Sequence, residues 1–207
     1  MFRNYLKTAL RNLRKHAGTS LINVAGLAVG MACAILIMLF VFDELGYDTF
    51  NRNYDRIWRV TRKWFNADGV VNLHLGQVAP PVGPLLKNDF PEILQAVRLI
   101  QTEGLLINAG PIYFEEDRFF FAEEPFFDVF TFKMTAGDPA TALRDPFTVV
   151  ITADMARKYF GAENPVGRPI TIQASGQSAD LKVTGVVEPL PAASHFHPDF
   201  LGSFKTY

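Results

Sequence analysis

One uncharged segment near the N-terminus constrains this chain more than any other feature. From Ala17 to Phe42 there is no Asp, Glu, Lys, Arg or His, and from Leu21 onward only Asn23 is strongly polar. As a helix, residues 21–42 would rise about 33 Å, enough to cover a hydrocarbon core about 30 Å thick. The sequence therefore predicts a transmembrane helix over residues 17–42.

A cleaved export signal is the alternative interpretation of this segment. Its apolar region would be about 7–15 residues long and would end at a small-residue site. Ala32-Cys33-Ala34 matches such a site, but it lies in the middle of the run, and the most apolar part, ILIMLFVF, follows it. Gly30-Met31-Ala32 is also a poor lipoprotein cleavage box ahead of Cys33. We therefore expect a retained anchor.

Two glycines within the run predict helix packing. Gly26 and Gly30 form the pattern GLAVG, which is of the G-x-x-x-G type. Small residues at this spacing let a second membrane helix approach closely, although glycine is common in membrane helices in general.

A basic segment precedes the apolar run. At about 100° per residue, its basic side chains fall on one arc of a helix, opposite an apolar arc. A helix of this kind beside a membrane span normally lies among the lipid headgroups, so we predict an amphipathic helix over residues 1–16 with membrane lipid as its partner. A solvated helix is the alternative. The basic residues are Arg3, Lys7, Arg11, Arg14 and Lys15, and the apolar ones are Phe2, Tyr5, Leu6, Ala9, Leu10 and Leu13.

The flanking charges predict the orientation of the span. Basic residues precede it, whereas Asp43, Glu44 and Asp48 follow it. The positive-inside bias then places the N-terminus in the cytoplasm and residues 43–207 outside. The single Cys lies in the apolar run, so the external part has no disulfide and depends on its core. A net charge of −1 argues against a nucleic-acid partner.

The external part is predicted to be an α+β domain with two lobes. Residues 54–65, 93–101, 111–122 and 147–152 have strand patterns, as do 168–173 and 181–188. A short helix is expected from Pro81 to Asp89. Thr152 is expected to cap a second helix that ends at Gly161, which gives a compact β-α-β-β unit. The aromatic stretch FFFAEEPFFDVFTFKM is interpreted as core.

The candidate motifs of the external part do not match the patterns that catalysis or ligand binding needs. We therefore predict no catalytic, cofactor-binding or metal-binding residues. Gly161-Ala-Glu-Asn-Pro-Val-Gly167 follows a helix and precedes a strand, the reverse of a phosphate-binding loop. His195, His197 and Asp199 alternate as metal ligands on a strand would, but a third His or a Cys is missing nearby, so a structural role is favoured. There is no G-x-S-x-G. The acids Glu115, Glu116, Asp117, Glu123 and Glu124 are interpreted as a solvated face.

Taken together, the segments resemble the N-terminal part of MacB/FtsX-type ABC transporter permeases: the first membrane helix followed by the MacB-like periplasmic core domain. The similarity extends over essentially the whole chain, and its segments occur in the expected order. They are NYLKTALRNLRKH, FDELGYDTFNRNYDRIWRV, LLKNDFPEI, FFDVFTFKMTAGDPATALRDP, VVITADMARKYFGAENPVGRPITI and VTGVVEPLPAASHFHPDFLGSF.

The resemblance implies a permease subunit in a bacterial inner membrane, with residues 43–207 in the periplasm. Its implied partners are a separate cytoplasmic ABC ATPase, a second permease copy, and a periplasmic adaptor with an outer-membrane channel. The implied function is substrate movement or force transmission, with ATP hydrolysed by the partner. Because a second apolar span is missing, we expect a fragment or truncated product. The alternative is a single-span, membrane-anchored binding or sensor module outside the cytoplasm.

Overall fold

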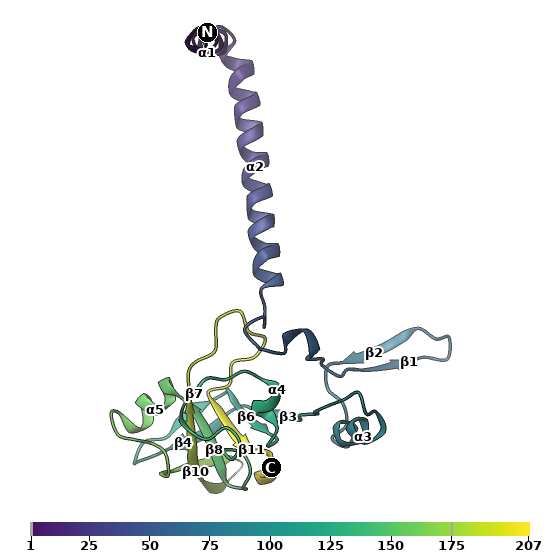
Figure 1. The fold of residues 1–207 in the computed structure, drawn as a ribbon, viewed down its shortest axis with the longest axis vertical. Coiled ribbons are helices and arrows are strands. Elements are labelled where there is room, and N and C mark those ends of the chain that lie inside the picture. The colour runs from purple at the N-terminus through teal and green to yellow at the C-terminus, as the bar shows by residue number, and fades with distance from the viewer. Residues whose placement is uncertain (1, 175) are drawn as a thin grey trace. The chain divides into compact units, whose positions relative to one another are not determined.

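The computed structural model describes residues 2–174 and 176–207, and the chain forms two compact units, Met1–Tyr47 and Asp48–Tyr207. The first unit consists of α1 (Phe2–Lys15) and α2 (Ala17–Leu45). Helix α2 begins at the first residue of the predicted span and continues past Phe42 through Asp43 and Glu44 (Figure 1).

The second unit contains both helices and strands, which confirms the predicted α+β class. Its main sheet has nine strands in the order β3-β6-β11-β8-β10-β9-β4-β5, and β7 also pairs with β10. These strands are β3 (Leu99–Thr102), β4 (Leu105–Asn108), β5 (Phe114–Glu116), β6 (Phe119–Ala122), β7 (Met134–Gly137), β8 (Thr148–Thr152), β9 (Pro169–Ala174), β10 (Gln177–Val187) and β11 (Phe200–Ser203).

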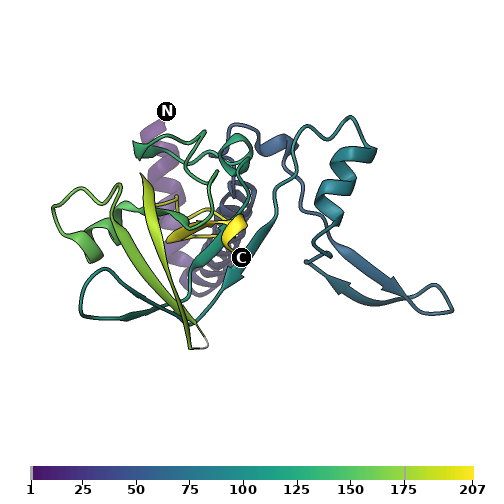
Figure 2. The ribbon, with the colours of Figure 1, turned by 90° about the horizontal axis from the view of Figure 1, so that it is seen from below.

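The remaining elements are a hairpin and short helices. The hairpin pairs β1 (Arg62–Phe65) with β2 (Val71–Leu75) in antiparallel fashion. Together with α3 (Val82–Asp89) it lies to one side of the main sheet (Figure 2). The other helices are α4 (Phe126–Val129), α5 (Ala153–Phe160) and the 3-10 turns Tyr54–Arg56 and Phe204–Thr206.

The predicted β-α-β-β unit is confirmed as β8, α5, β9 and β10. All residues of β8 are buried, and the strand pairs in parallel with β10, which is antiparallel to β9. The Thr152 side chain accepts a hydrogen bond from the Met155 N–H, 3.4 Å away, which caps α5. Gly161 ends α5 with a φ of +63°, a conformation that glycine adopts without steric cost.

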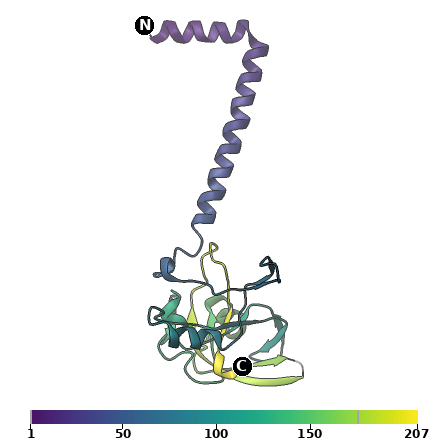
Figure 3. The same cartoon turned by 90° about the vertical axis from the view of Figure 1, so that its right-hand side faces the viewer.

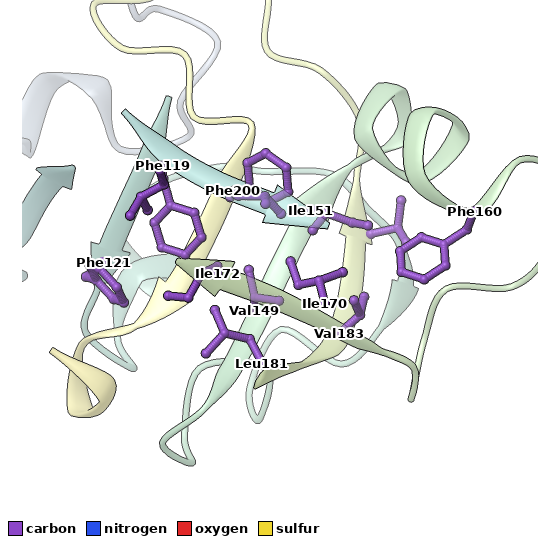
Figure 4. Close-up of a cluster of buried hydrophobic side chains, with 13 residues drawn as sticks. Phe119, Phe121, Val149, Ile151, Phe160, Ile170, Ile172, Leu181, Val183 and Phe200 are labelled. Atoms are coloured by element: carbon purple, nitrogen blue, oxygen red, sulfur yellow. The ribbon is translucent and has the colours of Figure 1, made fainter. Parts of the chain in front are cut away.

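Strand β10 is long, and it changes partners along its length. Residues 177–182 pair with β9, whereas residues 185–187 pair with β7. The pairing of β10 with β8 shifts register between Val183 and Gly185. The sheet curls, because side chains of β4 and β9 share one cluster with those of β6, β8 and β11 (Figure 4). Buried members of this cluster include Phe119, Phe121, Val149, Ile151, Phe160, Ile170, Ile172 and Phe200.

The opposite face of the central strands is buried by a second cluster. Alternation along the strands divides the side chains: Val149 and Ile151 belong to the first cluster, whereas Val150 belongs to the second. Much of the aromatic stretch lies in these two clusters, which confirms its interpretation as core. Buried members of the second cluster are Ala122, Phe126, Phe132, Ala142, Leu143, Val150, Val187 and Leu201.

Three predicted strands were wrong in extent. The strand predicted at residues 93–101 is confined to β3, which begins at Leu99. Of residues 54–65, only Arg62–Phe65 form a strand, because the preceding extended residues have no partner strand among those described. The stretch 111–122 forms two strands, β5 and β6, which pair with different neighbours. The helix predicted at Pro81–Asp89 is confirmed, with Pro81 at its N-cap.

Candidate functional site

The first unit has the geometry of a membrane anchor with a helix across one end. At His16 the backbone leaves the helical region, with φ −116° and ψ 49°, yet its carbonyl accepts a hydrogen bond from the Ser20 N–H at 2.9 Å. The chain therefore bends sharply between two helices, and α1 runs across the end of α2 (Figure 3). This arrangement suits one helix in the headgroup plane and one that crosses the bilayer.

The predicted basic residues all lie in α1. The side chains of Lys7, Arg11, Arg14 and Lys15 are exposed, whereas the Arg3 side chain lies outside the described part. Arg14 and Lys15 occupy the last turn, where a positive charge interacts favourably with the helix dipole. Their contact with a membrane surface remains a prediction.

Helix α2 is long and apolar enough to cross a bilayer, the one such helix among the described residues. Its length corresponds to about 43 Å, more than the hydrocarbon thickness. A Cβ atom placed on Gly26 or Gly30 would meet nothing within 4 Å. The predicted packing surface is thus open to another helix, and its use remains a prediction.

The second unit begins at a tightly bonded junction around Asp48. The Asp48 N–H donates to the Ala193 carbonyl at 2.9 Å, and the His195 N–H donates to Asp48 Oδ1 at 3.1 Å. Asp48 Oδ2 lies 2.6 Å from Nδ1 of His195. The backbone of Asp48 is in the left-handed region, with a φ of +57°, a conformation that Asp tolerates better than most residues.

Asn51 completes this junction from a buried position, with 3% of its surface exposed. Its Nδ2 donates to the Asp48 carbonyl at 3.1 Å, and its Oδ1 accepts from the Thr131 N–H at 2.9 Å. The Arg52 N–H in turn donates to Thr131 Oγ1 at 2.8 Å. Residues 48–52 are therefore hydrogen-bonded to two parts of the chain that are distant in sequence, residues 193–195 and Thr131.

The acidic residues do not form a catalytic pair. Glu116 is buried, which corrects its predicted place on a solvated face, because β5 turns its side chain toward α5. Its Oε1 accepts from Lys158 Nζ and from Tyr159 Oη, both at 2.6 Å. Burial, with the hydrogen bond to Glu116 added, raises the pKa of the Tyr159 hydroxyl, which keeps it protonated as a donor.

Two of the other acids form ion pairs with separate basic side chains. Glu123 pairs with Arg98, and Glu124 lies 3.2 Å from Nε of Arg144. A hollow of about 270 Å³ is lined by Glu123 and Glu124 together with Arg98 and Lys205. Both of these carboxylates form ion pairs with basic side chains, Glu123 with Arg98 and Glu124 with Arg144 and Lys205.

The histidines do not form a metal site in the described residues, which contain no group of three metal-ligating side chains. His195 binds Asp48, and Asp199 accepts from Arg118 Nε at 2.8 Å. His195 and Asp199 precede β11 in a loop, so they do not alternate along a strand, and the structural role favoured for them agrees with these contacts. Burial raises the pKa of Asp199 although Arg118 opposes the shift.

Comparison with known families identifies the fold. A family model described as the MacB-like periplasmic core domain matches residues 20–207. The chain belongs to the MacB-like periplasmic core domain family. The match begins within α2, so it includes most of the apolar helix and the whole Asp48 junction.

One solved structure shows a similar fold, and two others are more distant. A domain of a protein assigned as a permease from Porphyromonas gingivalis is 26% identical, with a TM-score of 0.54 over 65% of this chain and 56% of that one. The periplasmic region of MacB from Actinobacillus actinomycetemcomitans is 21% identical, with a TM-score of 0.41 over 54% of this chain and 49% of that one.

The extracellular domain of the noncanonic ABC-type transporter YknZ from Gram-positive bacteria is 17% identical, with a TM-score of 0.39 over 53% of this chain and 54% of that one. The chain thus spans about half the length of these structures. A comparison with curated proteins returned no match.

The sequence did not reveal the Asp48 junction. Asp48 and His195 are separated by 147 positions, and although both lie in segments that resemble the family, neither segment indicates that the two side chains meet. The run of Gly, Asp and Asn after the apolar helix indicates a turn, but not which segment it binds.

Proposed function

We propose that this MacB-like chain is a permease component of an ABC transporter. In this proposal α2 crosses a bacterial inner membrane, the N-terminus is cytoplasmic, and residues 43–207 are periplasmic. The observation that carries the proposal is the family match, which includes both the apolar helix and the external fold. The chain itself is non-catalytic, and a separate cytoplasmic ATPase supplies the energy.

The junction at Asp48 supports a mechanical role for this domain. A displacement of α2 would reach the domain through Gly46 and Tyr47, and Asp48 would pass it to residues 193–195. That segment leads directly into β11, which lies between β6 and β8 in the middle of the sheet. The domain would then move as a rigid body, carrying substrate or transmitting force on the periplasmic side.

The remaining partners follow from the same proposal. A second permease copy would pack against α2, with Gly26 and Gly30 as the contact positions, and α1 would lie on the cytoplasmic headgroups near the ATPase. A periplasmic adaptor and an outer-membrane channel would complete the pathway.

The proposal is tested by purifying the tagged chain from the membranes of its own host. We expect an ATP-binding-cassette protein to copurify, with ATP turnover in the complex. Changing Arg3, Lys7, Arg11 and Arg14 to Gln should leave insertion intact but weaken both uniform orientation and ATPase recruitment, because each basic residue contributes about 1 kcal/mol at an anionic leaflet.

Two controls define the outcome. Exchanging Lys and Arg at the same four positions keeps the charge and should preserve recruitment. Alkaline phosphatase fused after Asn66 should be active, and protease in spheroplasts should reach the external domain. An inactive fusion, or normal recruitment by the quadruple Gln variant, would contradict the proposed topology or the role of α1.

A further inference from the structure

Residues 54–65 expose an unusual set of aromatic side chains. Trp58 is 82% exposed, Phe65 61% and Tyr54 56%. Single exposed apolar residues are common on soluble proteins, but large ones gathered within one short segment mark an interaction surface. We call residues 54–65 the basic–aromatic segment.

The same segment carries positive charge without acidic partners. Among the described residues, no carboxylate lies within 4.0 Å of the charged nitrogens of Arg56, Arg59, Arg62 or Lys63. Elsewhere in the domain most basic residues are paired: Arg98, Arg118, Lys133, Arg144, Arg157, Lys158, Arg168 and Lys205 all form ion pairs. The partner of this segment should therefore be anionic.

The hairpin that continues from the segment also has an uncovered apolar face. Trp64 lies opposite Leu73, and these side chains are 40% and 46% exposed. The guanidinium of Arg62 lies 3.8 Å from the Trp64 ring centroid. A two-stranded hairpin is marginally stable alone, so this face is expected to be covered by a partner that is both apolar and anionic.

We propose that the basic–aromatic segment and the hairpin bind the anionic headgroup region of the membrane that α2 crosses. Trp and Tyr favour membrane–water interfaces, where Arg and Lys meet lipid phosphates. The chain from Leu45 to Trp58 can extend no further than about 45 Å, so this segment stays within that distance of the end of α2. A second copy is disfavoured as the occupant because two such segments would face each other with like charge.

This inference rests on the proposed crossing of the membrane by α2, and the experiment separates the two. The chain has two Trp residues, Trp58 and Trp64, both in the segment, so its Trp fluorescence reports on this surface alone. The full chain is reconstituted into vesicles of brominated phosphatidylcholine with an increasing fraction of brominated phosphatidylglycerol. We expect bromine quenching to increase with the anionic fraction, in the wild type and in W64F.

The charge requirement is tested with two matched double variants. R56Q/K63Q removes two exposed charges of the segment, and K87Q/K182Q removes two exposed charges elsewhere in the domain. Each basic residue raises binding to an anionic surface about fivefold, so R56Q/K63Q should weaken it roughly 25-fold and shift the quenching midpoint to a higher phosphatidylglycerol fraction. K87Q/K182Q should match the wild type.

Four outcomes would contradict parts of this proposal. Quenching that does not depend on phosphatidylglycerol, or an equal shift in both double variants, overturns the headgroup proposal. Trp residues that stay unquenched and lose acrylamide accessibility only with an added protein identify a protein surface instead. Chain that fails to float with the vesicles contradicts the membrane crossing of α2 itself.

Discussion

Nδ1 of His195 lies 2.6 Å from Oδ2 of Asp48, so the first residue of the second unit is bonded to the segment that enters the central strand β11. Asp48 also accepts from the His195 N–H and adopts a left-handed backbone. The residue type at position 48 therefore serves two needs, an acceptor side chain and tolerance of a positive φ.

We expect Asp48→Ala to destabilise the protein by about 2 kcal/mol, because it removes hydrogen bonds to a charged group and strains the left-handed backbone. Asp48→Asn keeps an acceptor and the backbone tolerance and should cost less. His195→Ala should cost under about 1 kcal/mol, since the ring is largely exposed and its backbone bond remains. Thermal unfolding in detergent checks this order, and equal losses for D48A and D48N would contradict it.

The buried carboxylate of Glu116 should matter more than the exposed ion pairs. Glu116→Ala leaves Tyr159 Oη without its acceptor and removes the partner of Lys158, so we expect a loss of about 2–3 kcal/mol. Tyr159→Phe removes one hydrogen bond and should cost about 1 kcal/mol. Arg157→Ala breaks only an exposed pair with Asp154 and is the control. If all three variants have the same thermal unfolding midpoint, the buried carboxylate of Glu116 does not stabilise the fold more than an exposed ion pair does.

Gly202 is required by close packing rather than by backbone conformation. A Cβ atom there would lie 2.9 Å from Cε1 of Phe119 and 3.0 Å from Cδ1 of Phe121. Gly202→Ala should therefore cost about 1–3 kcal/mol through overpacking. Gly110→Ala is the matched control, because a Cβ there meets nothing within 4 Å. Chemical unfolding of both variants would refute this account if G202A were as stable as G110A.

Asp199 should contribute more to the stability of the fold at acidic pH than at neutral pH. Burial raises its folded pKa above the ordinary value of 3.8, although Arg118 pulls it down. The folded state then binds the proton more tightly than the unfolded state, so this residue's contribution to stability falls as pH rises from 3.8 through the folded pKa. The Asp199→Asn variant does not titrate at this position, so its stability should not fall in this way as pH rises.

The midpoint of thermal unfolding, measured against pH for the wild type and D199N, tests that sign. The unfolding midpoint of D199N should rise relative to that of the wild type as pH increases from below 3.8 to neutral. Above that range the difference between the two midpoints should stay constant. A wild type that gains on D199N over this window would show that the Arg118 ion pair outweighs burial.

Local signals explain which parts of the fold could be predicted. The apolar run predicted α2, and Pro81 predicted the start of α3. Thr152 and Gly161 predicted the two ends of α5. Each of these depends on a few neighbouring residues.

Elements that depend on distant partners were missed. Strands β4, β7 and β11 are short and exist because other segments pair with them. Residues 57–61 have strand-forming side chains but no described partner strand, so propensity alone was misleading there. The alternation of His195 and His197 suggested a strand and ligands, whereas a contact with Asp48, 147 positions away, explains His195.

The central claim is that a partner ATPase moves this domain, and the most direct measurement is a distance between the domains of two copies. Cys33 is the single Cys, so Cys33→Ala with Lys182→Cys places one spin label on the exposed side of β10. In the copurified complex, pulsed electron paramagnetic resonance should give different label–label distances without nucleotide and with trapped ATP, because the domains move with α2. A distance distribution that stays the same in both states, while the complex hydrolyses ATP, would contradict the account.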